Sequence, residues 1–71
     1  MLNVERIRAH RLRLQMSQKQ LGESVGQDQA YISRLERGEI TDITIRTLER
    51  LADALRCSTD YLLGREGAHP V

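Results

Sequence analysis

Two short helical patterns with a glycine between them constrain this chain more than any other feature. They lie in the stretch SQKQLGESVGQDQAYISRLERGE, residues 17–39. Leu21 and Val25 mark the inner face of the first pattern. Ile32 and Leu35 mark that of the second, because these spacings put side chains on one side of a helix. Two short helices joined by so tight a turn must cross steeply, and they are stable only if further helices cover their apolar faces.

The rest of the chain supplies such helices, because helical periodicity recurs along it and strand signals are nearly absent. Five helices are predicted, over about residues 3–14, 18–25, 29–37, 45–56 and 59–63. Each begins at, or directly after, a residue type that caps helices well, and these are Asn3, Ser17, Asp28, Thr44 and Ser58. The predicted fold is therefore all-α, a compact five-helix domain over residues 1–64. Residues 65–71 have no period and hold the only proline, which indicates a flexible C-terminal tail.

Composition excludes several classes of protein. A chain of 71 residues forms one domain, near the size at which a single core is only just sufficient. Cys57 is the only cysteine, which rules out a disulfide framework and fits a reducing compartment. One cysteine with His10 and His69 cannot supply the usual zinc ligands at ligand spacing. No apolar run has the length of a signal peptide or a membrane span. We therefore expect a cytoplasmic protein with no cofactor, no metal and no membrane association.

The net charge of +1 hides an uneven distribution. Up to Arg37 the chain carries seven Lys or Arg against four Asp or Glu, and from Gly38 onward it carries four against six. The basic half is also the half that contains the paired helical patterns, which favours an anionic partner there. A mixed-charge surface that only keeps the protein in solution is the alternative interpretation.

The residues around the two patterns resemble a known family. Six residues stand at the spacing of a helix-turn-helix, and these are Gln18, Leu21, Gly22, Gly26, Ile32 and Leu35. Four sequence segments are similar to those of the Cro/repressor-type family, also called XRE or lambda-repressor-like. They are SQKQL, YISRLERG, TLERLADAL and STDYLLG. The similarity covers about residues 4–64. It implies a five-helix lambda-repressor-like DNA-binding domain, whose second and third helices form the helix-turn-helix and whose third helix enters the major groove.

The outward side of the predicted third helix carries side chains suited to base edges. The candidates for base contacts are Gln29, Ala30, Ser33 and Arg34. Glutamine pairs with adenine and arginine with guanine through two hydrogen bonds, and a small apolar side chain can meet the thymine methyl group. The resemblance implies that Gln29, Ala30 and Arg34 face the bases, with Ser33 close by. A solvated helix face without a ligand is the alternative.

A second group of side chains is expected to contact the DNA backbone. It consists of Gln18, Lys19, Tyr31 and Arg37. Gln18 begins the second helix, where exposed N–H groups and the positive end of the helix dipole favour a phosphate, and the family glutamine at this position typically binds one. Tyr31 is in part a candidate for packing at the helix edge. Arginines of the first helix could extend the positive field, and these are Arg6, Arg8 and Arg13.

Arg11 and Glu36 are charged residues on the apolar sides of their predicted helices. A buried charge needs a partner, and members of the family often pair the residues at these two positions. We therefore expect a structural ion pair that fixes the first helix against the third.

The sequence departs from the family pattern at several positions. Gln15 and Arg56 stand where glycines often end the first and fourth helices, and Ile43 replaces a common proline. Glu39 and Asp42 place acidic charge in a loop where many relatives carry basic phosphate contacts. Fewer backbone contacts are therefore expected from that loop.

These patterns predict a sequence-specific, double-stranded DNA-binding transcriptional regulator of bacterial or phage type, with repression as the expected activity. An enzyme is not expected, because the sequence shows no paired carboxylates, no nucleophile with a base and no glycine-rich phosphate loop. The rival hypothesis is a protein-interaction module, or an antitoxin-type regulator that binds a protein partner through the same fold.

A homodimer on a two-fold operator is expected, since one recognition helix reads only a few base pairs. Two groups of apolar side chains are candidate dimer surfaces. The first is Ile40, Ile43 and Ile45, some of which could instead complete the core, and the second is Tyr61 with Leu62.

Overall fold

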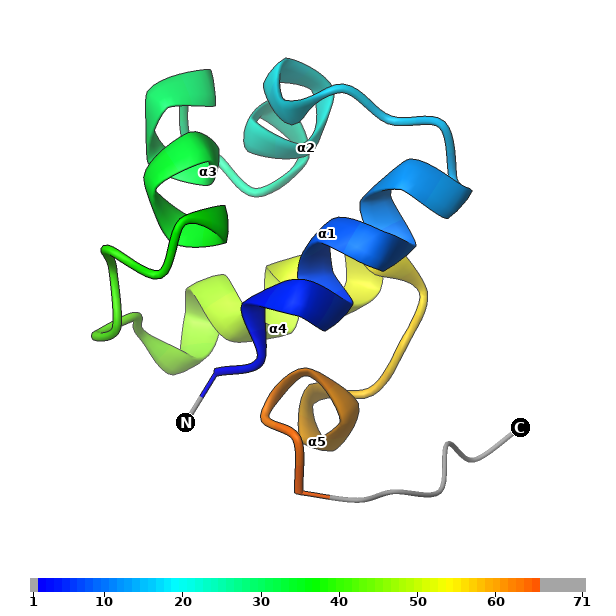
Figure 1. Ribbon diagram of the computed structural model, residues 1–71, viewed down its shortest axis with the longest axis vertical. Helices are drawn as coiled ribbons and strands as arrows, with labels where there is room; N and C mark the ends of the chain where they lie inside the picture. The colour runs from blue at the N-terminus through cyan, green and yellow to red at the C-terminus, as the bar shows by residue number, and fades with distance from the viewer. Residues whose placement is uncertain (1, 66–71) are drawn as a thin grey trace.

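The computed structural model describes residues 2–65, which form five helices (Figure 1). They are α1 (Val4–Arg13), α2 (Gln18–Ser24), α3 (Gln29–Glu36), α4 (Ile45–Leu55) and α5 (Thr59–Leu62). The predicted all-α architecture is confirmed, and each helix ends one residue before its predicted end. Of the predicted tail, only Arg65 is described, and residues 66–71 lie outside the described part. The boundary at residue 64 stays a prediction.

Every helix begins at a side chain that caps it. The capping side chains are those of Asn3, Ser17, Asp28, Thr44 and Ser58, and each accepts a hydrogen bond from the third backbone N–H that follows it. At α2 the arrangement is reciprocal, because the Gln20 side chain also accepts from the backbone N–H of Ser17 at 2.8 Å. Such caps contribute about 1 kcal/mol each, and they fix the starting residues of helices too short to be stable alone.

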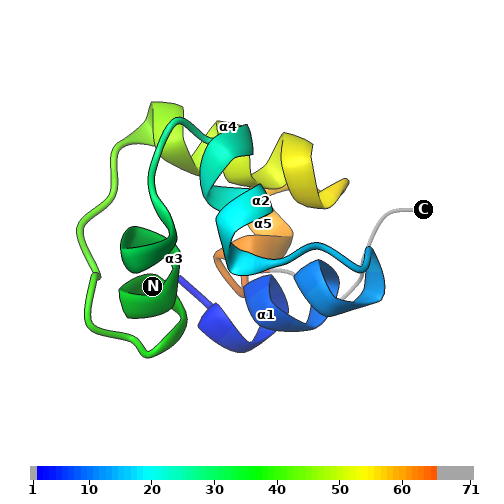
Figure 2. The same ribbon diagram turned by 90° about the horizontal axis from the view of Figure 1, so that it is seen from above.

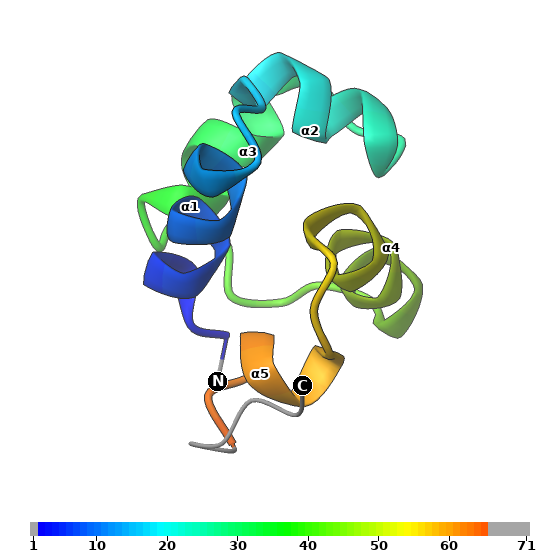
Figure 3. The ribbon, with the colours of Figure 1, turned by 90° about the vertical axis from the view of Figure 1, so that its right-hand side faces the viewer.

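One core lies between the helices. It consists of Ile7, Leu21, Val25, Ile32, Leu35, Leu51, Ala52, Leu55 and Leu62. Figure 3 shows how the helices are arranged, with α1 on the left, α4 on the right, α2 at the top and α5 at the bottom. The prediction that Leu62 forms a dimer surface is wrong, because its side chain lies in the core and is fully buried.

The helix-turn-helix is formed by α2 and α3, which lie together at one end of the molecule (Figures 1 and 2). The turn between them contains Gly26, whose φ of 76° is a conformation that glycine adopts without strain. The backbone N–H of Gln27 donates to the carbonyl oxygen of Gly22 at 2.8 Å and closes the end of α2. The short connection between α2 and α3 is thereby closed by the backbone itself. None of the helices within residues 2–65 is long and apolar enough to cross a membrane.

Two helix ends adopt the left-handed conformation without a glycine. Gln15, just beyond α1, has a φ of 58°, and Arg56, at the end of α4, has a φ of 59°. These are the positions where the family pattern favours glycine. A side chain in this conformation costs about 1 to 2 kcal/mol, so the chain keeps the turn and tolerates the strain.

Replacing Arg56 with glycine should raise the free energy of unfolding by about 0.5 to 1 kcal/mol, since the strain removed exceeds the extra entropy of glycine in the unfolded chain. Thermal unfolding followed by circular dichroism would show a melting temperature several degrees higher. Glu49→Gly is the matched control, because Glu49 is exposed within α4, and there a glycine should lower the melting temperature. A lower melting temperature for Arg56→Gly as well would contradict the account of strain.

Candidate nucleic-acid interface

The outward face of α3 carries the four side chains predicted to contact bases. Gln29, Ala30 and Arg34 are exposed and Ser33 is half-buried. Ile32 and Leu35 lie on the opposite side of the helix and are fully buried, so the polar side chains face outward. The structure therefore presents Gln29, Ala30, Ser33 and Arg34 on one helix at the edge of the molecule (Figure 1).

The expected ion pair between Arg11 of α1 and Glu36 of α3 is present. Arg11 Nε donates to Glu36 Oε2 at 2.7 Å and Arg11 Nη2 donates to Glu36 Oε1 at 3.0 Å. Only 9% of the Arg11 side chain and 5% of the Glu36 side chain are exposed. Arg11 Nη1 also donates to the carbonyl oxygen of Met16 at 3.0 Å. The two-pronged geometry leaves α3 little freedom to slide or rotate against α1.

Gln18, a predicted phosphate contact, has a partner that the sequence did not indicate. Its side-chain Nε2 donates to Glu36 Oε1 at 3.2 Å, so the carboxylate of Glu36 is shared between Arg11 and Gln18. The Gln18 side chain is half-buried and lies at the first position of α2. No spacing relates residues 18 and 36, so this link could be found only from the tertiary structure.

An open cleft of about 320 Å³ lies where α1, α2 and α3 meet. It is lined by Arg8, Arg11, Gln18, Ser33, Glu36 and Arg37. Polar and cationic side chains therefore continue from the face of α3 onto the neighbouring helices, which suits a phosphate backbone.

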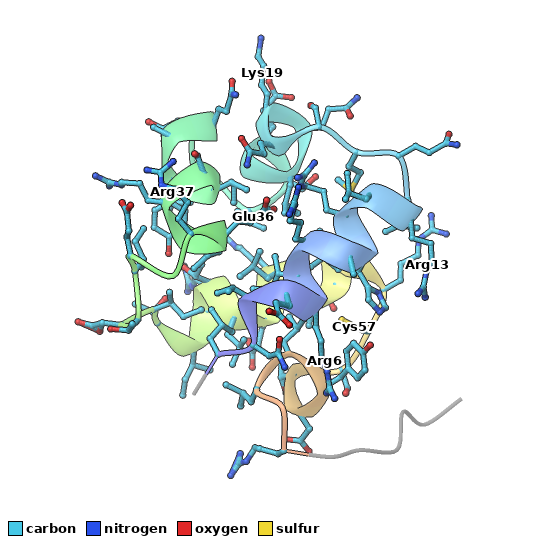
Figure 4. All side chains as sticks on the ribbon, viewed as in Figure 1. Arg6, Arg13, Lys19, Glu36, Arg37 and Cys57 are labelled. Carbon is cyan, nitrogen blue, oxygen red and sulfur yellow. The ribbon has the colours of Figure 1, made fainter. Side chains whose placement is uncertain are left out.

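Of the three arginines of α1 expected to extend the positive field, only Arg8 lines this cleft. Arg6 Nη1 donates to the carbonyl oxygen of Tyr61 at 2.9 Å, and its guanidinium lies 4.3 Å from the centre of the Tyr61 ring. Arg6 thus joins α1 to α5, and Figure 4 shows Arg13 at the far end of α1 from the labelled Arg37. Arg6 therefore contributes to the packing of α5, and its contribution to the positive field stays a prediction.

The remaining predicted backbone contacts differ in exposure. Lys19 is exposed and points away from the molecule beyond α2 (Figure 4). Tyr31 is half-buried and packs against the core, and burial raises the pKa of its hydroxyl above the ordinary value. The expected packing role of Tyr31 at the helix edge is therefore present, whereas no described residue forms a hydrogen bond or ion pair with the side chain of Lys19.

Arg37, at the end of α3, is exposed but internally paired. Its Nε and Nη2 donate to the two carboxylate oxygens of Glu39 at 2.9 and 3.2 Å, and its Nη1 donates to Ser33 Oγ at 2.6 Å. The hydrogen bond and charge of Glu39 raise the pKa of Arg37, and the hydrogen bond from Arg37 lowers the pKa of Glu39. The acidic charge of Glu39 is evident from the sequence, whereas its pairing with Arg37 is evident only from the structure.

The described residues show no group of three His, Cys, Asp or Glu side chains that could hold a metal ion. Cys57 is half-buried, and burial raises the pKa of its thiol above the ordinary value. Neither feature adds a chemical role to the polar face of α3.

Comparison with known proteins gives a family for this arrangement. The helix-turn-helix family model matches residues 7–62. The chain is 48% identical over 59 residues to repressor protein C2 of Salmonella phage P22, and 41% identical over 63 residues to control protein C.SmaI of Serratia marcescens. These alignments cover 83% and 89% of this chain. They span 27% of the P22 repressor and 74% of the C.SmaI protein, so the chain corresponds to about a quarter of the former.

Solved structures agree with the sequence comparison. The P22 c2 repressor in complex with a synthetic operator superposes with a TM-score of 0.83 at 44% identity, covering 93% of this chain and 98% of that one. A SinR protein/SinI protein complex matches with a TM-score of 0.78 at 32% identity, covering 89% of this chain and 60% of that one. With its five helices and its α2–α3 motif, the chain belongs to the helix-turn-helix family, of the Cro/repressor type that its sequence resembles.

Proposed function

We propose that this protein is a sequence-specific, double-stranded DNA-binding transcriptional repressor that reads the major groove with α3. The observation that carries the proposal is the exposed polar face of α3, held against α1 by the buried Arg11–Glu36 pair. Similarity to a protein named a repressor, and to a repressor structure solved with its operator, supports it. Neither the P22 repressor nor the C.SmaI control protein is named an enzyme. A bacterial or phage operator would place this function in the cytoplasm.

The proposed contacts fall into two groups. Base edges are read by Gln29, Ala30, Ser33 and Arg34, and the backbone is held by Gln18, Lys19, Tyr31 and Arg37. Phosphate contacts of this kind set register and affinity, whereas base contacts set sequence preference. The cleft between α1, α2 and α3 supports this division, because it lies beside the α3 face and carries cations.

A homodimer on a two-fold operator completes the proposal, because one helix reads few base pairs. Of the candidate dimer surfaces, Ile45 is 72% exposed, whereas Ile40 and Ile43 are half-buried against the core. Tyr61 is half-buried and lies under the guanidinium of Arg6. Ile45 is therefore the side chain best placed to meet a second copy.

A protein partner is the second candidate function, because one solved relative is a complex of two proteins. The face of α3 argues against its use as a protein-docking site. Gln29 and Arg34 are exposed there, and no large apolar side chain of α3 is exposed among the described residues. A regulatory partner would thus bind elsewhere, without replacing the role in DNA binding.

The test is a selection of duplexes from random DNA with wild-type protein and with Arg34→Ala. We expect a two-fold symmetric consensus from wild type. Arg34→Ala should lose preference at one position in each half-site, at a cost of about 1 to 3 kcal/mol, because an arginine contacting guanine through two hydrogen bonds carries that much discrimination.

Arg13→Ala is the matched control, since it removes the same charge from the far end of α1 and should keep the consensus. A consensus that Arg34→Ala leaves intact would remove Arg34 from the proposed base contacts. A folded wild-type protein that retains no duplex would overturn the proposed function.

A further inference from the structure

We infer that Glu39 is an internal competitor for the DNA phosphate that Arg37 would bind, and that it lowers DNA affinity by the same factor for every sequence. The inference rests on the proposed function and assigns a role to a residue outside the predicted contacts. Its basis is the geometry of the Arg37–Glu39 pair.

The guanidinium of Arg37 has three nitrogens, and each donates within the protein. Nε and Nη2 form one edge, and both donate to the Glu39 carboxylate, at 2.9 and 3.2 Å. A phosphate is bound by arginine through the same kind of paired N–H groups. Glu39 therefore occupies the edge of Arg37 that a DNA phosphate would use.

The third nitrogen orients this edge. Nη1 donates to Ser33 Oγ at 2.6 Å, and Ser33 lies one turn earlier in α3, on the face proposed to read bases. The bond to Ser33 can persist while the other edge exchanges a carboxylate for a phosphate. The guanidinium is thus already directed along the interface, and only its anionic partner has to change.

The exchange is feasible because the pair is exposed. The side chains of Arg37 and Glu39 are 55% and 52% exposed, so water and salt screen their attraction and the pair is easily opened. A carboxylate released from Arg37 still lies beside the incoming phosphates and repels them. Since phosphates carry no sequence information, the resulting loss of affinity applies equally to operator and random DNA.

The experiment measures binding of wild type and Glu39→Gln to two duplexes, the best one from the random-DNA selection and one of scrambled sequence, over a range of salt concentrations. We expect Glu39→Gln to bind both about two- to fivefold more tightly at low salt, by the same factor for each. The slope of log affinity against log salt should become steeper by up to about 0.9, as one more cation becomes available to phosphate.

Asp42→Asn is the matched control. Asp42 is exposed in the same loop, and no described residue forms a hydrogen bond or ion pair with its side chain. This variant should gain less than Glu39→Gln. In an Arg37→Gln background, the gain from Glu39→Gln should fall to the level of the control, because the competition needs both members of the pair.

The inference is overturned by equal gains from Glu39→Gln and Asp42→Asn, by a gain that survives without Arg37, or by weaker binding of Glu39→Gln. Any of these results would leave the proposed function standing if wild type binds its selected duplex. A folded wild type that binds neither duplex would overturn the proposed function and the inference together. Circular dichroism and thermal unfolding of each variant establish that the differences do not come from lost structure.

Discussion

Replacing Glu36 with glutamine should lower the free energy of unfolding by about 3 to 5 kcal/mol. The change leaves the charge of Arg11 without its counterion in a site where only 9% of the side chain is exposed. It also disturbs the hydrogen bond that Glu36 accepts from Gln18. Single domains of this length have a total stability of roughly 4 to 10 kcal/mol, so the variant should lose a large part of its stability.

Urea unfolding followed by circular dichroism measures this loss directly. Arg37→Gln is the control, because it breaks an exposed ion pair and should leave the free energy of unfolding nearly unchanged. If Glu36→Gln and Arg37→Gln unfold at the same urea concentration, the buried pair does not stabilise the fold in the way its geometry indicates.

A double replacement separates the pair from its surroundings. Arg11→Met with Glu36→Leu leaves no uncompensated charge, so it should recover much of the stability that Glu36→Gln loses. Full recovery is not expected, since the carbonyl oxygen of Met16 and the side chain of Gln18 each lose a partner. A double variant no more stable than Glu36→Gln would contradict the view that an unpaired buried charge causes the loss.

The helices could be predicted almost to the residue because their starts are encoded locally. Ser17 and Asp28, for example, cap α2 and α3 through hydrogen bonds to residues only three positions away. The ends were each predicted one residue too long, and α2 gives an example of the cause. Val25 has a φ of −108° and a ψ of 8° after α2, although its side chain still packs inside. Apolar periodicity alone does not register that change of backbone.

The candidate site was predictable only in part, because the sequence displays the local pattern of each helix and not the contacts between helices. The outward face of α3 follows from the positions of Ile32 and Leu35, which the sequence displays. The partners of the functional side chains do not follow, because they depend on where other elements bring their atoms. Arg6, for example, donates a hydrogen bond to the backbone carbonyl oxygen of Tyr61, which lies 55 positions later in the chain. Base and phosphate contacts remain predictions until DNA binding is measured.

Gly22, one of the residues at the spacing of a helix-turn-helix, lies against the chain that connects α2 to α3. A Cβ atom added to Gly22 would lie 2.8 Å from the carbonyl oxygen of Asp28 and 3.0 Å from that of Gln27. The neighbour is therefore the backbone that leads into α3, not a side chain of α3. A backbone segment held by the Asp28 cap cannot move aside as a flexible side chain would.

Replacing Gly22 with alanine should therefore destabilise the protein by about 1 to 3 kcal/mol, although alanine is by itself the better helix former. The cost of overpacking exceeds the gain in helix propensity of roughly 1 kcal/mol, and thermal unfolding should show a melting temperature lower by about 5 to 20 °C. Glu23→Ala is the matched control, since Glu23 is the next residue of α2 and is exposed, so its melting temperature should stay near that of wild type. A Gly22→Ala protein as stable as wild type would mean that the turn between α2 and α3 can shift. In that case the position of α3 would depend mainly on the Arg11–Glu36 pair.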